Sequence, residues 1–227
     1  MIESPADPHP SNTGLASERV RARMVERVRE LGVRDARVLA VLGSLRRHVF
    51  VDPALSSRAY EDSPLPIGLG QTISQPYIVA RSAEWALQAC ADPARARVLE
   101  VGTGCGYAAA FLACLFGTVL SIERLRELHE QARANLRPLR VANLRLLHGD
   151  GMLGVPAQAP FDAIVAAAAG ETLPSAWSEQ LAIGGCIVAP IGDADQRLTL
   201  FVKEPGGRLR QRHSEPVRFV PLRPGTQ

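Results

Sequence analysis

The sequence predicts an α/β protein built around a doubly wound parallel sheet. From residue 97 onward, short continuous apolar runs such as Val98–Val101 and Val119–Glu123 alternate with segments of helical pattern. Strands that helices cover on both faces show such runs, because neither face of the sheet meets water. The composition agrees, since 46% of the residues are hydrophobic and only 5% are aromatic. Aliphatic residues and alanine therefore fill the predicted core.

The length of 227 residues fits one large domain with a small N-terminal addition. Residues 1–16 contain three prolines and no apolar stretch, so we expect a disordered lead-in rather than a signal peptide. A single domain over residues 17–227 follows. Within it, residues 17–78 form a helical and loop subregion, and residues 79–227 form the sheet core and the C-terminal strands.

The subregion 17–78 begins with two amphipathic helices. Ser17 is suited to cap the first helix, which Gly32 ends, and Asp35 is suited to cap the second. Between residues 49 and 78, proline and glycine interrupt any periodicity. An idle loop of about thirty residues is uncommon in a compact domain. This stretch is therefore expected to carry function.

The remaining elements follow in chain order and are bounded by turn residues. They are a helix over Tyr107–Phe116, a helix ending near Arg137, strands over Leu144–Leu147, Ile164–Ala168, Ile187–Ile191 and Leu198–Val202, and one or two strands over Leu209–Leu222.

Charge and cysteine content argue against several classes of protein. The net charge is only +3, and the arginines of the first helix are expected to be a solvated face, so we predict no nucleic-acid partner. The four cysteines form no C-x-x-C pair, which predicts reduced thiols, no metal site and a cytoplasmic location. No apolar run approaches the roughly 18 residues of a membrane span.

A glycine-rich loop, Gly102-Thr-Gly104-Cys-Gly106, follows the first strand of the core and opens a helix. Glycines at such a turn let the backbone approach a ligand closely. The dinucleotide fingerprint requires a third glycine where this chain has Tyr107, whose ring is expected to hinder the close passage of a pyrophosphate. We therefore favour S-adenosylmethionine, whose methionine part carries no phosphate, over a nicotinamide dinucleotide.

Acidic residues stand at the carboxyl ends of three neighbouring strands. Glu123 follows the loop at the distance of a ribose-binding carboxylate. Asp150, followed by Gly151, is placed beside the adenine pocket. For Glu100 two interpretations remain open, a partner of the helix N-terminus or a group near the cationic end of the cofactor.

Several blocks of the sequence, in order, resemble the protein-L-isoaspartate O-methyltransferases. One block is Asp62-Ser-Pro-Leu-Pro-Ile-Gly-Leu-Gly-Gln-Thr-Ile-Ser-Gln-Pro-Tyr77, in which Gln71–Pro76 is far more specific than the glycine loop. The resemblance covers about Arg19 to Leu222. The others are VLEVGTGCGY from Val98, HGDG from His148, Phe161–Val165, Gly184-Gly185 and Val217–Leu222. The family fold implied is a seven-stranded mixed methyltransferase sheet with an N-terminal helical extension.

The resemblance also implies roles for individual residues. Ser74 is expected to be catalytic, with Thr72 and Ile73 beside it near cofactor and substrate, and Val217–Leu222 is expected to line the peptide groove. The residues expected to bind S-adenosylmethionine are Thr72, Ile73, Ser74, Glu100, Gly102, Thr103, Gly104, Gly106, Glu123, Asp150 and Gly151. The chain departs from the family pattern at Cys105 and at the alanine run Ala166–Ala169.

The reaction implied is methylation of the α-carboxylate of L-isoaspartyl residues in damaged proteins and peptides. The ester then forms a succinimide, which opens partly to normal aspartate. We expect a monomer. Two alternatives stay open: a methyltransferase that modifies aspartate in a biosynthetic precursor, and a binding module without catalysis.

Overall fold

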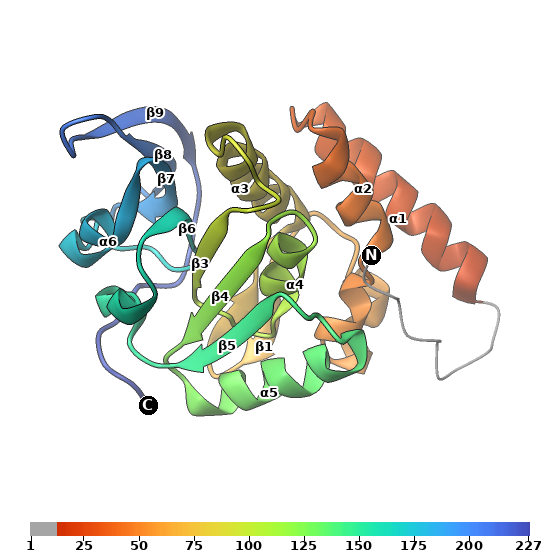
Figure 1. The fold of residues 1–227 in the computed structure, drawn as a ribbon. Coiled ribbons are helices and arrows are strands. Elements are labelled where there is room, and N and C mark those ends of the chain that lie inside the picture. Colours follow the sequence, from red (N-terminus) through yellow and green to blue (C-terminus); the bar gives the residue numbers. More distant parts are fainter. Residues whose placement is uncertain (1–12) are drawn as a thin grey trace.

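A computed structural model describes residues 13–227. Its main feature is a seven-stranded sheet with the strand order β5-β4-β3-β6-β7-β8-β9 (Figure 1). The strands β5, β4, β3, β6 and β7 are parallel, whereas β8 runs antiparallel to both β7 and β9. The predicted mixed, doubly wound sheet is confirmed. The strands are β3 (Arg97–Val101), β4 (Thr118–Glu123), β5 (Leu144–His148), β6 (Phe161–Ala166), β7 (Leu181–Ile191), β8 (Arg197–Lys203) and β9 (Leu209–Pro216).

Helices cover both faces of the sheet. On one face α3 (Pro76–Ala89), α4 (Tyr107–Ala113) and α5 (Arg126–Leu136) bury a core that includes Val98, Val119 and Val188. On the other face, α6 (Ser175–Gln180) places the fully buried Trp177 against Leu99 and Ile164. Five short 3-10 helices lie in the connections: η1 (Arg47–Phe50), η2 (Pro53–Arg58), η3 (Arg137–Leu139), η4 (Gly151–Leu153) and η5 (Pro156–Gln158).

The N-terminal helices α1 (Thr13–Glu30) and α2 (Ala36–Ser44) lie together at one side of the molecule, next to α3 (Figure 1). Gly32 follows α1 with a φ of 109°, and Asp35 caps α2 by accepting hydrogen bonds from the amides of Arg37 and Val38. Both predictions are confirmed. The predicted cap at Ser17 is wrong, because α1 already includes residues 13–16. The rest of the predicted lead-in, residues 1–12, lies outside the described residues.

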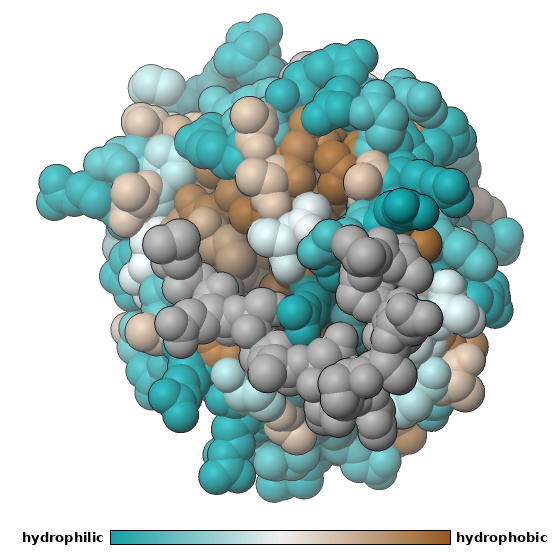
Figure 2. Space-filling model, turned by 90° about the vertical axis from the view of Figure 1, so that its right-hand side faces the viewer, coloured by the Kyte–Doolittle hydropathy of each residue, from teal (hydrophilic) through white to brown (hydrophobic). Residues whose placement is uncertain are grey.

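The arginine-rich face of α1 is solvated, as predicted. Arg27 and Arg29 are exposed and form ion pairs with Glu30 and Glu26 of the same helix. Figure 2, which looks onto this side of the molecule, shows mainly hydrophilic residues around smaller apolar patches. Ion pairs of this exposed kind contribute little to stability.

The stretch between residues 49 and 78 contains a feature that the sequence analysis did not predict. Strands β1 (Leu65–Gly68) and β2 (Gln71–Ile73) form an antiparallel hairpin that stands apart from the main sheet. Its turn contains Leu69, a non-glycine residue with a φ of 52°, between two glycines that also have positive φ. The hairpin leads through Ser74 and Gln75 directly into α3.

Several predicted boundaries shift. The helix predicted over Tyr107–Phe116 ends at Ala113, and β6 ends at Ala166, before Ala167 and Ala168. After β9 the described chain continues without a further strand, although a bridge joins Ala169 to Pro221. Of the one or two strands predicted over residues 209–222, the structure contains one.

Candidate active site

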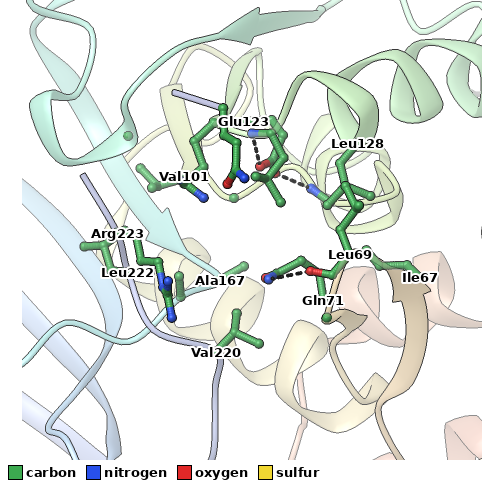
Figure 3. A pocket seen from close by; sticks show the side chains of 18 of the residues that line it. Ile67, Leu69, Gln71, Val101, Glu123, Leu128, Ala167, Val220, Leu222 and Arg223 are labelled. Carbon is green, nitrogen blue, oxygen red and sulfur yellow. Dashed lines mark hydrogen bonds between the residues drawn. The ribbon is translucent and has the colours of Figure 1, made fainter. Parts of the chain in front are cut away.

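A cavity of about 650 Å³ opens at the carboxyl ends of the parallel strands (Figure 3). This is the edge at which open α/β sheets bind ligands, and the volume suits a small molecule. Three parts of the chain form its walls: the β1–β2 hairpin, the loops after β3, β4 and β6, and the segment that follows β9. Its lining includes Ile67, Leu69, Gln71, Thr72, Val101, Gly102, Gly104, Ile122, Glu123, Leu125, Leu128, Gly151, Ala167, Val220, Leu222 and Arg223.

The glycine loop contributes two of its glycines to the cavity. Gly102 and Gly104 line the cavity with φ values of 95° and 55°. A Cβ at Gly104 would lie 3.1 Å from Cδ1 of Ile67, so the hairpin packs directly over the loop. Gly106 does not line the cavity; a Cβ there would lie 2.8 Å from Cδ1 of Leu136. Gly106 therefore permits the close packing of α5 instead of facing a ligand.

Glu123 lies at the end of β4 with its carboxylate at the cavity wall. The carboxylate oxygens accept hydrogen bonds from the amides of Gly104 (2.9 Å) and Leu125 (3.0 Å). The residue is only 5% exposed, yet it lines the cavity. Each carboxylate oxygen has a further lone pair, so two hydroxyl groups of a ligand can still bind there.

Glu100 is buried behind the glycine loop. The Ser121 hydroxyl donates to Oε2 of Glu100, and Thr103 bonds to the same hydroxyl at 2.5 Å. Oε1 of Glu100 has no partner among the described residues. Burial raises the pKa of Glu100 to about 8, so the isolated carboxyl group is mainly protonated at neutral pH.

Thr103 and Glu100 therefore do not reach the large cavity. Thr103 is 4% exposed and faces Ser121. Glu100 borders a separate void of about 30 Å³, which Ser74 and Ala167 also line.

Asp150 lies beside the cavity, and its carboxylate binds backbone amides. Oδ1 accepts from Met152 (2.8 Å) and Oδ2 accepts from Gly225 (2.6 Å). The next residue, Gly151, lines the cavity, and its carbonyl accepts a 2.8 Å hydrogen bond from the indole of Trp177. Asp150 thus ties the C-terminal segment to the rim of the cavity.

Ser74 lies on a second, smaller groove of about 90 Å³, bounded on the other side by residues 216–220. The Ser74 side chain is half-buried and lines this groove. Thr72, Ala167 and Val220 line this groove and the large cavity as well, so the two spaces adjoin. The neighbouring Ile73 is 4% exposed and points into the core, away from both spaces.

The structure corrects one argument about Tyr107. Its ring is 1% exposed and packs against Phe50 and Phe111 with the Arg47 guanidinium 4.9 Å from the ring centroid. The ring therefore points into the core and does not obstruct the ligand side of the loop. Cys105 is buried as well, and burial raises the pKa of its thiol to about 11, which marks it as a packing residue.

The sequence analysis missed the hairpin turn as a cavity wall. Leu69 and Gln71 reach the cavity from one side, while Leu222 and Arg223 face it from the other (Figure 3). Three consecutive residues with positive φ, Gly68 to Gly70, form this turn. The pair of glycines around position 69 was the available signal, because such spacing is typical of a tight hairpin.

Two negative findings apply to the described part of the chain. Residues 13–227 contain no helix long and apolar enough to span a membrane. The same residues contain no group of three or more histidine, cysteine or acidic side chains arranged to hold a metal ion.

The sheet, the glycine loop and the carboxylate after β4 define a methyltransferase of the Rossmann-like class. Residues 19–227 match the family model described as protein-L-isoaspartate(D-aspartate) O-methyltransferase. The chain therefore belongs to the protein-L-isoaspartate O-methyltransferase family. Its activity is the transfer of a methyl group from S-adenosylmethionine to isoaspartyl residues of proteins and peptides.

Individual relatives agree with this assignment. The chain is 54% identical over 231 residues to a protein-L-isoaspartate O-methyltransferase of Bordetella parapertussis, with 100% of this chain and 88% of the relative covered. It is 56% identical to one from Burkholderia mallei, covering 93% of this chain and 65% of that protein.

Solved structures of the family share the fold. A protein-L-isoaspartate O-methyltransferase structure superposes with a TM-score of 0.77 at 29% identity, over 88% of this chain and 65% of that one. A Plasmodium falciparum structure titled as a putative member of the family, in complex with S-adenosyl-L-homocysteine, gives a TM-score of 0.78 at 24% identity. It covers 89% of this chain and 98% of that one.

Proposed function

We propose that methyl transfer takes place where the large cavity meets the small groove, with the methyl donor in the cavity and the isoaspartyl carboxylate beside Ser74. The observation that carries this proposal is the shared wall of Thr72, Ala167 and Val220. A donor and an acceptor held in two spaces that adjoin can bring their reacting atoms into contact. Ser74 lies on the acceptor side of this wall.

The residues around the large cavity fit S-adenosylmethionine. Gly102 and Gly104 provide a backbone cradle for the methionine part, and Glu123 provides acceptors for both ribose hydroxyls. Gly151, together with Ile122, offers an apolar edge suited to adenine. When bound, S-adenosylmethionine supplies a methyl group already activated by its sulfonium.

Glu100, Thr103, Gly106, Ile73 and Asp150 act from behind these residues. Glu100 and Thr103 support the floor of the glycine loop through Ser121, and Asp150 holds the C-terminal segment at the adenine end. Each of them shapes the cavity without lining it. We therefore propose that these five residues pack and position the cavity walls, whereas the resemblance implied that they contact the cofactor or lie beside it.

The chemistry requires orientation more than proton transfer. An α-carboxyl group has a pKa near 3.5, so at neutral pH the acceptor is already the anionic nucleophile. Holding one carboxylate oxygen in line with the methyl–sulfur bond can account for about 7–11 kcal/mol of the barrier. The Ser74 hydroxyl, on the wall of the groove, is suited to donate a hydrogen bond to the second carboxylate oxygen.

Selection of isoaspartate over aspartate depends on the shape of the groove. The segment 216–220 forms one wall and Ser74 and Gln75 form the other. A peptide whose backbone runs along residues 216–220 presents one free side carboxylate, which is the α-carboxylate in isoaspartate and the β-carboxylate in aspartate. The distance of this carboxylate from the peptide backbone differs between the two isomers. The alanine run after β6 leaves the junction less polar than a threonine would.

We also propose that the chain works as a monomer in the cytoplasm without a nucleic-acid partner. All four cysteines are unpaired, and Cys105 and Cys186 are buried, which suits a reducing compartment. The net charge of +3 is spread along the chain, and the arginines of α1 are partly neutralised within the helix.

The proposal is tested with labelled S-adenosylmethionine and two peptides that differ only in aspartate or isoaspartate. We expect a base-labile methyl ester, detected by the labelled methanol that it releases, from the isoaspartyl peptide alone. Methylation of only the normal peptide would support the precursor-modifying alternative, and methylation of neither would support a binding module. Either result would contradict the proposed repair reaction.

A further inference from the structure

A network of buried charged and phenolic side chains lies behind the substrate groove and outside both cavities. It joins Tyr77, Arg81 and Glu84 of α3 to Glu215 of β9. The side chains of Glu84 and Arg81 are 2% and 12% exposed, and that of Glu215 is 31% exposed. Removing a charged side chain from water costs free energy unless it gains hydrogen-bond or ion-pair partners, so these side chains require the partners described next.

Both oxygens of Glu215 are held by α3. The Tyr77 hydroxyl donates to Oε2 at 2.6 Å, and Nε of Arg81 lies 3.2 Å from Oε1. The Arg81 guanidinium also donates to the Tyr77 hydroxyl at 3.1 Å and lies 5.3 Å from the centre of the tyrosine ring. The three side chains therefore fix one another in a single geometry.

The chain positions of Tyr77 and Glu215 connect this contact to both walls of the groove. Tyr77 follows Ser74 by three residues at the start of α3, and its amide is anchored to Asp62 at 2.8 Å. Glu215 precedes Val217 by two residues at the end of β9. One wall of the groove is thus continuous with Tyr77 and the other with Glu215. Their hydrogen bond spans 138 positions of sequence.

The other side of the network holds the turn between α1 and α2. Arg81 donates to the carbonyls of Leu31 and Gly32 after the end of α1, and Glu84 accepts from the amides of Arg34 and Asp35 before α2. A cation at a helix C-terminus and an anion at a helix N-terminus both match the helix dipoles.

The turn approaches this network very closely. Gly32 has a φ of 109°, and a Cβ there would lie 2.8 Å from Nη2 of Arg81. A side chain at position 32 would require a strained left-handed backbone and a shift of the Arg81 guanidinium. No described residue of α1 or α2 lines the cavity or the groove.

We infer that Glu215, gripped by Tyr77 and Arg81, is a positioning residue that sets the spacing between the two walls of the substrate groove. The inference rests on the proposed function, because it assumes that the isoaspartyl peptide lies between Ser74 and residues 216–220. It also gives the N-terminal helices a role: they hold Arg81 in place from the far side.

The test compares Glu215→Gln and Tyr77→Phe with the wild-type chain. For each protein we would measure kcat and KM for an isoaspartyl peptide, the Kd for S-adenosyl-L-homocysteine, and the Tm. We expect the peptide KM to rise about fivefold or more in each variant, because a charge-assisted hydrogen bond across the groove is lost. The Kd for S-adenosyl-L-homocysteine is expected to stay within about twofold of wild type.

Glu204→Gln is the matched control. The Glu204 side chain is 34% exposed and pairs with Arg210 at 3.3 Å, so it loses a comparable ion pair away from the groove. We expect its peptide KM to equal that of the wild type. The double variant Tyr77→Phe/Glu215→Gln is expected to be no worse than the more impaired single variant, because both changes break one contact.

Two outcomes overturn the inference. One is an unchanged peptide KM in Glu215→Gln while the wild type is active. The other is a parallel loss of peptide and S-adenosyl-L-homocysteine binding, which would indicate general loosening of the fold. A wild-type chain that methylates neither peptide would instead contradict the proposed function itself.

Discussion

The amide of Gly104, in the loop after β3, donates a 2.9 Å hydrogen bond to Oε2 of Glu123, the last residue of β4. Oε1 of the same carboxylate accepts from Leu125. Glu123 therefore fixes the shape of the glycine loop and of the turn after β4, besides presenting lone pairs to the cavity. A single side chain thus links the two parts of the cavity to which the proposed function assigns the methionine and ribose portions of the donor.

Glu123→Ala is predicted to weaken S-adenosyl-L-homocysteine binding, because it removes the ribose acceptors and frees the Gly104 amide. Two charge-assisted hydrogen bonds contribute about 2–4 kcal/mol, or a Kd increase of roughly 30-fold or more. Glu123→Gln keeps one acceptor and should lose less. Calorimetry measures both, with Glu130→Gln on the exposed side of α5 as the control. An unaltered Kd in the alanine variant would exclude the ribose role.

Ser74→Ala is predicted to lower kcat for an isoaspartyl peptide with little change in Tm. Ser74 is half-buried on the wall of the groove, so removing its hydroxyl leaves the packing of the core unchanged. We expect a decrease of about tenfold, equivalent to one neutral or charge-assisted hydrogen bond in the transition state. Ser56→Ala, in η2 and away from the cavities, provides the control. Wild-type kinetics in Ser74→Ala would remove Ser74 from the site.

Glu100 makes the stability of the ligand-free protein depend on pH. Its pKa is raised by burial from 4.5 to about 8, so the folded state retains a proton that the unfolded state releases. The stabilising contribution is complete below about pH 4.5 and is lost as pH rises through about 8. Glu100→Gln cannot ionise and keeps a partner for Ser121, so it should lose less stability over this window.

Urea unfolding at about pH 5, 6.5 and 8 measures this difference. The free energy of unfolding of Glu100→Gln, relative to wild type, should increase with pH across the series. Parallel pH profiles for the two proteins would show that Glu100 titrates normally.

Leu69 stores backbone strain at the hairpin turn. A non-glycine residue in the left-handed region costs about 1–2 kcal/mol, and Leu69 occupies it with a φ of 52° and a 51% exposed side chain. Leu69→Gly should therefore be more stable to urea than Leu69→Ala by about 1 kcal/mol, since alanine retains the Cβ and glycine does not. Equal stability of the two variants would contradict the strain. Both should bind S-adenosyl-L-homocysteine more weakly, because Leu69 lines the cavity.

The glycine loop and Glu123 could be predicted because their chemistry is local. Strand, glycine turn and acidic residue occur at fixed spacing, and a parallel sheet brings the ends of neighbouring strands to one edge. The positions of Thr103, Ile73 and Asp150 relative to the cavity could not be predicted this way. Their side chains point toward Ser121, the core and Gly225 respectively, and each direction depends on a partner far away in sequence.

The hairpin and the C-terminal wall depend on tertiary structure even more strongly. Leu69 faces the cavity only because Ile67 packs over Gly104. Residues 217–222 are apolar enough for a strand, yet the Ala169 carbonyl accepts from Leu222 and the segment crosses the sheet end instead. Tyr107 is a further example. Its position in the sequence predicted a ring that hinders a ligand at the glycine loop, whereas in the structure the ring points into the core.

The sequence by itself determined the fold class, the edge of the sheet that carries the site and the family to be expected, because hydrophobic periodicity and short motifs act over a few residues. Tertiary structure alone decided which residues of these motifs reach the cavity and which support it. It also decided that Tyr77 meets Glu215 behind the groove. The physical reason is that side-chain direction is set by packing between elements, and the partners in that packing are distant in the chain.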